Sequence, residues 1–118
     1  MNEQDLKVRT KSFALMVIKL YSMLPKTTVA QVLGKQVLRS GTSVGAQYRE
    51  AQRAKSDADF INKIEGSLQE LEETAYWLEL IEEAGIISED KLALLLKETN
   101  ELTAIFVSIV RKVKTKRR

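Results

Sequence analysis

Residues 56–85 read SDADFINKIEGSLQELEETAYWLELIEEAG and carry the clearest periodic pattern of the chain. Ser56 followed by Asp57 is a typical helix N-cap, and Gly85 is a typical C-terminal cap. Between them, apolar residues recur with the alternating three-and-four spacing of a helix-bundle seam: Ile61, Ile64, Leu68, Leu71, Ala75 and Leu78. The stretch therefore predicts one long helix that packs its apolar side against neighbours.

Two more helices are expected before this stretch. The first covers about residues 5–23, because Pro25 pushes the residue before it out of the helical region. Thr27 or Thr28 can cap the second, which we extend to about Lys55.

The fourth expected helix follows Gly85. Ser88 opens it, with Glu89 and Asp90 in the first turn. Its seam is Leu92, Leu95, Thr99, Leu102, Phe106, Ile109 and Val113. Because short connections join long helices, the fold class is expected to be all-α, an antiparallel up-down four-helix bundle.

The segment SGTSVG at residues 40–45 is the weak point of the second helix. Each glycine costs about 1 kcal/mol inside a helix, so composition alone leaves helix and loop equally open here. If the segment is helical, Ser40, Val44 and Ala51 share a side with Leu33 and Val37, and their small size allows close packing. A phosphate-binding loop is rejected because no Gly-Lys-Ser/Thr ending is present.

Composition limits the chemistry of the chain. Its 118 residues predict a single domain over residues 1–110, followed by a basic C-terminal tail at 111–118. With no Cys and no His, disulfides, thiolate or imidazole zinc sites and imidazole bases are excluded. Helical di-iron sites need a Glu-x-x-His pair, so the glutamates Glu70, Glu73 and Glu79 do not indicate one. We expect no cofactor, no metal, no catalytic residue and no enzyme activity.

Membrane insertion is not expected either. The longest apolar stretch, residues 13–24, is interrupted by Lys19 and falls short of the ~20 residues that a crossing needs. The expectation is a soluble cytoplasmic protein.

Charge is distributed very unevenly around the net +3. Residues 26–55 hold six basic side chains and one acid, residues 56–84 hold one basic side chain and nine acids, and residues 111–118 hold six basic side chains and no acid. This asymmetry indicates a basic second helix, an acidic third helix and a basic tail.

The basic residues of the second helix are ordered. Lys35, Arg39, Arg49 and Arg53 lie within an arc of about 80° on an ideal helix, away from its apolar side. They can pair with the acidic third helix or contact phosphates, and both alternatives stay open. The tail has no internal acid to pair with, and is either solvated or a second phosphate contact. It contains Arg111, Lys112, Lys114, Lys116, Arg117 and Arg118.

Six apolar residues lie off the main seams of the third and fourth helices: Tyr76, Trp77, Leu80, Ile105, Val107 and Val110. They form either a wide stripe inside one subunit's core or an interface between subunits.

The sequence also resembles a known family. QVLRSGTSVGAQYREA at residues 36–51, Phe60-Ile61 and GSLQELEET at residues 66–74 resemble the bacterial four-helix-bundle proteins encoded within intervening sequences of 23S rRNA genes. The family commonly has Asn where this chain has Gln47, so no role is transferred to that position, and many members have Gly at the position of Ala51. The resemblance implies a continuous second helix and a ring-shaped homopentamer. It also implies kinship with accessory proteins of diversity-generating retroelements, basic pentamers that work with a reverse transcriptase and nucleic acid.

Three functions follow as hypotheses. The first is a non-catalytic, homo-oligomeric protein that binds the backbone of RNA or DNA through its basic surfaces. The second is a scaffold or accessory protein, for example for a reverse transcriptase. The third and least supported is an enzyme.

Overall fold

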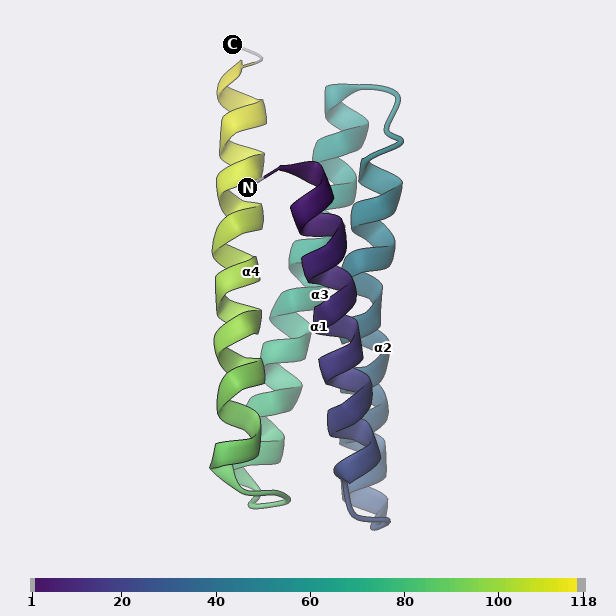
Figure 1. Cartoon of the computed structure of the whole chain (residues 1–118), viewed down its shortest axis with the longest axis vertical. Helices are drawn as coiled ribbons and strands as arrows, with labels where there is room; N and C mark the ends of the chain where they lie inside the picture. The colour runs from purple at the N-terminus through teal and green to yellow at the C-terminus, as the bar shows by residue number, and fades with distance from the viewer. Residues whose placement is uncertain (1, 117–118) are drawn as a thin grey trace.

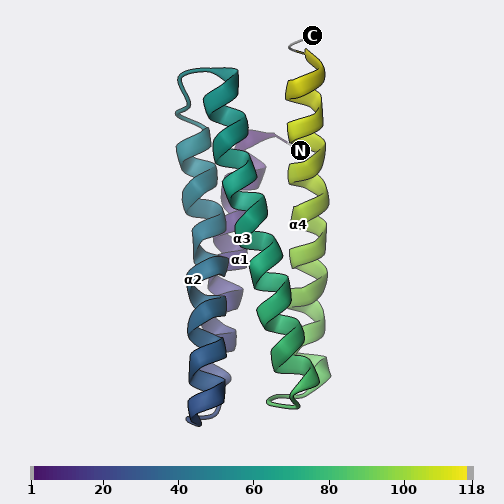
Figure 2. The same ribbon diagram turned by 180° about the vertical axis from the view of Figure 1, so that it is seen from behind.

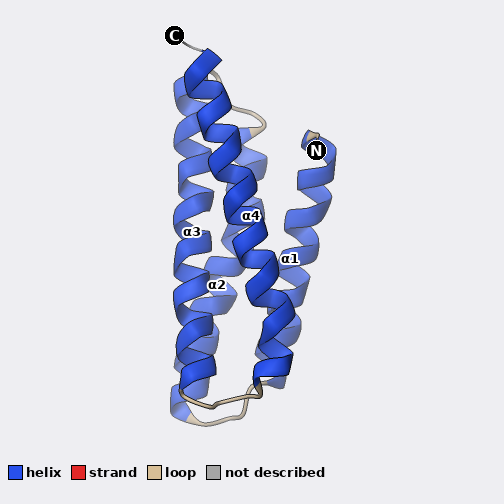
Figure 3. Ribbon diagram, turned by 90° about the vertical axis from the view of Figure 1, so that its left-hand side faces the viewer, coloured by secondary structure: helices blue, strands red, loops and turns tan. Residues whose placement is uncertain are grey.

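Four long helices make up the computed structural model, which describes residues 2–116 except for the side chain of Glu3. They are α1 (Glu3–Met23), α2 (Thr28–Ala51), α3 (Asp57–Glu83) and α4 (Glu89–Lys116). Each runs opposite to the previous one along a bundle of 49 × 20 × 19 Å (Figure 1). Figure 3 shows helices joined by short loops, and no strand occurs within residues 2–116. The predicted all-α four-helix bundle is confirmed.

Three predicted caps are present. The Thr27 hydroxyl accepts a hydrogen bond from Ala30 N at 3.3 Å. The Ser56 hydroxyl accepts one from Asp59 N at 3.0 Å. Gly85 has φ +68°, which any larger side chain would oppose, and ends α3 in a left-handed turn.

Two helix boundaries differ from the prediction, and the structure adds the end of α4, which the sequence left open. Asn2 caps α1 by accepting from Asp5 N at 2.9 Å, so this helix begins two residues early. α2 ends at Ala51 instead of Lys55, because tight turn bonds such as Arg53 N to Glu50 O at 3.0 Å take over. α4 continues through Lys116, so residues 111–116 of the predicted tail are helical. Arg117 and Arg118 lie outside the described residues.

α2 is continuous through residues 40–45, as the family resemblance implied. Gly41 is buried in the contact between α2 and α1. A Cβ atom built on Gly41 would lie only 2.6 Å from Cγ2 of Val17 on α1. Gly41 has a poor helix propensity, but its lack of a side chain lets α1 and α2 pack closely, which offsets that cost.

The helices follow one another around the bundle. α2 packs against α1 and α3, and α3 packs against α4, whereas α1 touches α4 only sparsely. No Cα of α1 comes within 8 Å of α3, so these two helices lie on a diagonal. Figure 2 shows α3 running between α2 and α4. Within the described helices, none is long and apolar enough to cross a membrane.

The buried side of α3 differs in part from the predicted seam. Ser67 and Thr74 are fully buried, while the neighbouring Leu68 and Ala75 are only partly buried. The hydroxyl oxygens of Thr74 and Ser40 are 2.7 Å apart. These small residues face α2, where hydrogen bonds satisfy their hydroxyl groups.

The end of the α4 seam also shifts. Val110 is buried, with 8% exposure, whereas the predicted Ile109 and Val113 are partly buried against the core. A straight α-helix drifts by about 20° per heptad from a strict three-and-four repeat. This drift accounts for the core-facing position passing from Ile109 to Val110.

Candidate functional site

The predicted basic stripe of α2 divides into two parts. Nη1 of Arg39 lies 3.3 Å from Oε1 of Glu70, and its Nη2 lies 2.6 Å from Oε1 of Glu73. The pairing alternative therefore holds for Arg39. Lys35, one turn earlier, is exposed and forms no ion pair within residues 2–116.

Arg49 and Arg53 lie in a different environment, at the end of α2 and just beyond it. Together with Lys7 of α1 and Gln52 they line a polar hollow of about 390 Å³, which we call the basic hollow. Both arginines are exposed, and in the described part of the chain none of the three cations pairs with a carboxylate. Lys7 was not among the predicted residues, because only the packing of α1 on α2 brings it there.

The acids closest in sequence to the basic hollow have other partners. Glu50 pairs with Lys63, with 3.3 Å between Oε1 and Nζ. Asp5 accepts from Asn2 N at 3.3 Å within the cap of α1. The hollow is therefore a concave surface lined by three positive charges and one amide.

The last turns of α4 form a second basic surface. Arg111, Lys112, Lys114 and Lys116 are all exposed. Among the described side chains one pairing involves them, with Lys114 Nζ 3.5 Å from Oε2 of Glu65, and both side chains are about half exposed. Such an exposed pair is worth about 0–1 kcal/mol, so it leaves Lys114 available to a ligand.

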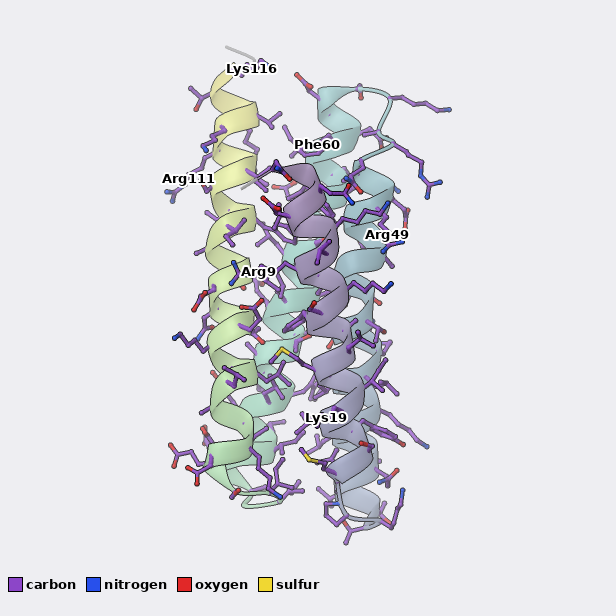
Figure 4. All side chains as sticks on the ribbon, in the orientation of Figure 1. Arg9, Lys19, Arg49, Phe60, Arg111 and Lys116 are labelled. Carbon is purple, nitrogen blue, oxygen red and sulfur yellow. The ribbon has the colours of Figure 1, made fainter. Side chains whose placement is uncertain are left out.

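Both basic surfaces lie at one end of the bundle, where α1 begins and where α2 and α4 end (Figure 1). Figure 4 shows the labelled Arg49 on α2 on one side of this end, and Arg111 and Lys116 on α4 on the other. Of the predicted cations, Arg49 and Arg53 lie at this end together with those of residues 111–116, whereas Lys35 and Arg39 lie further along α2 and belong to neither surface.

The residues predicted as an oligomer interface have mixed exposure. Tyr76 is 54% exposed, while Trp77, Leu80, Ile105 and Val107 are partly buried. The prediction of Val110 is corrected, because this residue belongs to the core of the single subunit. The Trp77 indole Nε1 is buried with no hydrogen-bond partner among the described residues.

Apolar exposure is instead concentrated on α1. Val8, Leu15, Ile18 and Met23 are exposed, and they are half of the large apolar side chains exposed among the described residues. The apolar residues of α1 lie nearly all around the helix, so its sequence alone does not show which of them face solvent.

Among the side chains that the structure describes, no group of three or more Asp or Glu could hold a metal ion.

Comparisons with known proteins show which family the chain belongs to. The family model for 23S rRNA-intervening sequence proteins matches residues 3–108. The chain belongs to this family. It is 38% identical to a protein of unknown function from the S23 ribosomal protein family of Bacteroides thetaiotaomicron VPI-5482. That crystal structure has a TM-score of 0.87 to the present one, and the match covers 94% of this chain and 99% of that chain.

No curated protein matches the chain. The basic hollow lies within the region matched by the 23S rRNA-intervening sequence family model, whereas the cations of residues 111–116 lie beyond it.

Proposed function

We propose that the protein is a non-catalytic nucleic-acid-binding protein that contacts the phosphate backbone of RNA or DNA and acts as a homo-oligomer. The family resemblance favours a homopentameric ring. The observation that carries the binding proposal is the basic hollow, because Lys7, Arg49 and Arg53 converge there and have no carboxylate partner among the described side chains.

The electrostatic potential inside a concave basic surface is more positive than the net charge of +3 alone would suggest. Phosphates neutralise such surfaces without reading base edges, so we expect little sequence preference. Tyr48 is the sole aromatic residue in the basic segments at 26–55 and 111–118, and it is buried. Stacking on unpaired bases is therefore not the expected main contribution to binding.

In a ring, every subunit would contribute its own copy of both basic surfaces. A homopentamer would present the basic hollow and the α4 cations once per subunit at the same end of the assembly. Backbone contacts from several subunits along one nucleic acid would raise the overall affinity through effective concentration.

Fluorescence anisotropy tests the proposal with a labelled duplex DNA longer than the 49 Å bundle, and with duplex and single-stranded RNA as further arms. For duplex DNA, log affinity should fall linearly with log salt between roughly 50 and 200 mM, with a slope of about −0.9 per phosphate neutralised. Arg49→Ala and Arg53→Ala should each flatten the slope by up to about 0.9.

Two variants with the same loss of charge serve as controls. Lys26→Ala removes an exposed charge at the opposite end of the bundle and should leave the slope unchanged. Arg39→Ala removes a side chain already paired with Glu70 and Glu73, so it should flatten the slope less than Arg49→Ala. Equal effects of Arg49→Ala and Lys26→Ala would reject the hollow as the site. Absence of binding at about 50 mM salt would reject the function and favour the scaffold.

A further inference from the structure

The solvent-facing side of α1 carries a row of exposed residues, which we call the α1 seam. Val8, Lys11, Leu15 and Ile18 follow one another at spacings of three and four, and they are all exposed. Val8, Leu15 and Ile18 are 58%, 57% and 46% exposed. With Lys19 they lie within an arc of about 100°, a regular apolar stripe flanked by lysines and not a set of scattered residues.

The charge on this stripe has one sign. From residue 6 to residue 24 the chain contains four basic residues and no acid. Arg9 points to α4 and is paired there, and Lys7 lines the basic hollow, so Lys11 and Lys19 set the charge of the outer side.

The outer face of α3 has the same spacing and the opposite charge. Its exposed residues recur at intervals of three and four over an arc of about 80°. They are Glu65, Gln69, Glu72, Tyr76, Glu79 and Glu83. Tyr76 is the one large apolar side chain on this acidic seam, and within the described residues Glu72 and Glu79 have no ion-pair partner.

Because α1 and α3 are diagonal in the bundle, one subunit can use both seams at the same time. A contact between the α1 seam of one copy and the α3 seam of the next is therefore heterologous, and it closes into a ring if the rotation fits. An isologous contact of α1 with α1 would instead place lysines against lysines.

The exposed seams of α1 and α3 also lie at similar heights along the long axis of the bundle. Val17 on α1 lies against Gly41 on α2, and the adjacent Ser40 bonds to Thr74 on α3. Val17 and Thr74 are thus at nearly the same height.

Ile18 follows Val17 by one residue and Tyr76 follows Thr74 by two. With 1.5 Å rise per residue, and with Ser40 one residue from Gly41 on the antiparallel α2, the heights of Ile18 and Tyr76 differ by about 3 Å. In a closed ring whose axis runs along the bundle, rotation from one copy to the next preserves height, so residues at equal heights meet. Lys19 would then lie at a height between Glu72 and Glu79.

From the matched spacing, charge and height, we infer that a second copy of this chain covers the α1 seam, with Ile18 of one subunit against Tyr76 of the next. This inference rests on the proposed homo-oligomer and names its contact. It retains Tyr76 from the predicted interface and adds the α1 residues that the sequence did not indicate.

Cysteine cross-linking tests the contact, and the chain has no native cysteine to interfere. Ile18→Cys and Tyr76→Cys are prepared separately and treated with a short bis-maleimide alone and as a mixture. The mixture should give covalent dimers and each variant alone should not. The double variant should give a ladder that stops at the number of subunits in the ring. Val29→Cys mixed with Tyr76→Cys measures collisional background, because Val29 is exposed but lies on neither seam.

Charge exchange provides an independent measurement by light scattering after size exclusion. Lys11→Glu with Lys19→Glu should raise the concentration at which the oligomer dissociates by more than about tenfold, as should Glu72→Lys with Glu79→Lys. All four substitutions in one chain should restore assembly.

The outcomes separate the inference from the proposed function. An oligomer in which Ile18→Cys cross-links to itself, or in which the mixture gives only background, overturns the inference and leaves the homo-oligomer. A monomer at micromolar concentration overturns both the homo-oligomer and this contact. Nucleic-acid binding by the basic hollow is measured separately in the anisotropy assay and does not depend on either result.

Discussion

Arg9 on α1 donates two hydrogen bonds to Glu98 on α4, from Nε to Oε2 at 2.8 Å and from Nη2 to Oε1 at 2.7 Å. Its Nη2 also donates to Glu101 at 2.8 Å. The hydrogen bond to Glu98 raises the pKa of Arg9 above its usual value, so the guanidinium stays charged throughout the pH range in which proteins fold. Because α1 and α4 touch sparsely, this fork is a principal link between them.

Removing the fork should loosen this side of the bundle. Arg9→Met leaves Glu98, whose side chain is only 19% exposed, without its partner, and should lower the free energy of unfolding by about 1–2 kcal/mol. Arg9→Lys keeps the charge but not the bidentate geometry, and should lose less. Urea unfolding at one fixed protein concentration measures both, with Lys26→Met as a surface control expected within about 0.5 kcal/mol of the parent. Equal stability of Arg9→Met and Lys26→Met would show that the fork contributes nothing.

Replacing Gly41 and Gly66 with alanine should change the stability of the protein in different ways. In Gly41→Ala the new methyl group meets Val17, a fully buried β-branched side chain with little freedom to move. Overpacking should then cost about 1–3 kcal/mol despite the gain in helix propensity. In Gly66→Ala the methyl group meets only the flexible amide end of Gln47, so stability should be unchanged or rise by up to about 1 kcal/mol. Thermal unfolding of the two variants distinguishes them, and the reverse order would contradict the close packing of α1 on α2.

The Ser40–Thr74 pair should show energetic coupling. Thr74 Oγ1 donates to Glu70 O at 2.8 Å, which leaves the Ser40 hydroxyl to donate to Thr74. Thr74→Val removes that acceptor inside the core and should cost about 1–2 kcal/mol. In Ser40→Ala/Thr74→Val, no hydroxyl of the pair is left unsatisfied, so the double variant should lose less than the sum of the single losses. Strict additivity in a double-mutant cycle would argue against the hydrogen bond.

This pair also shows what the sequence could predict and what it could not. Helix number and the Thr27, Ser56 and Gly85 caps depend on local chemistry, so they could be predicted from residues near in sequence. The burial of Ser67 and Thr74 instead of Leu68 and Ala75 depends on where α2 supplies partners for hydroxyl groups. That information lies about 23–34 residues away in the chain.

The same limit applies to the basic hollow. The sequence indicated Arg49 and Arg53 as basic, but Arg39 in the same stripe pairs with α3 and they do not. Only the packing of the helices decides which cations meet an acid and which meet Lys7. Likewise, periodicity could not show that Val8, Leu15 and Ile18 face solvent, since α1 has apolar residues on several sides.

The final prediction concerns the end of α4. Val113 is its last residue packed against the core, and the residues after it make one long, exposed ion pair within the described part of the chain. Deleting residues 114–118 should therefore change the free energy of unfolding by less than about 0.5 kcal/mol. The deletion removes Lys114, Lys116, Arg117 and Arg118, so the salt slope of duplex DNA binding should flatten by up to about 0.9 for each of them that contacts a phosphate. A variant with these four residues changed to Gln keeps the chain length and should give the same slope. If the deletion flattens the slope and the Gln variant does not, chain length and not charge is responsible, and the α4 cations are not phosphate contacts.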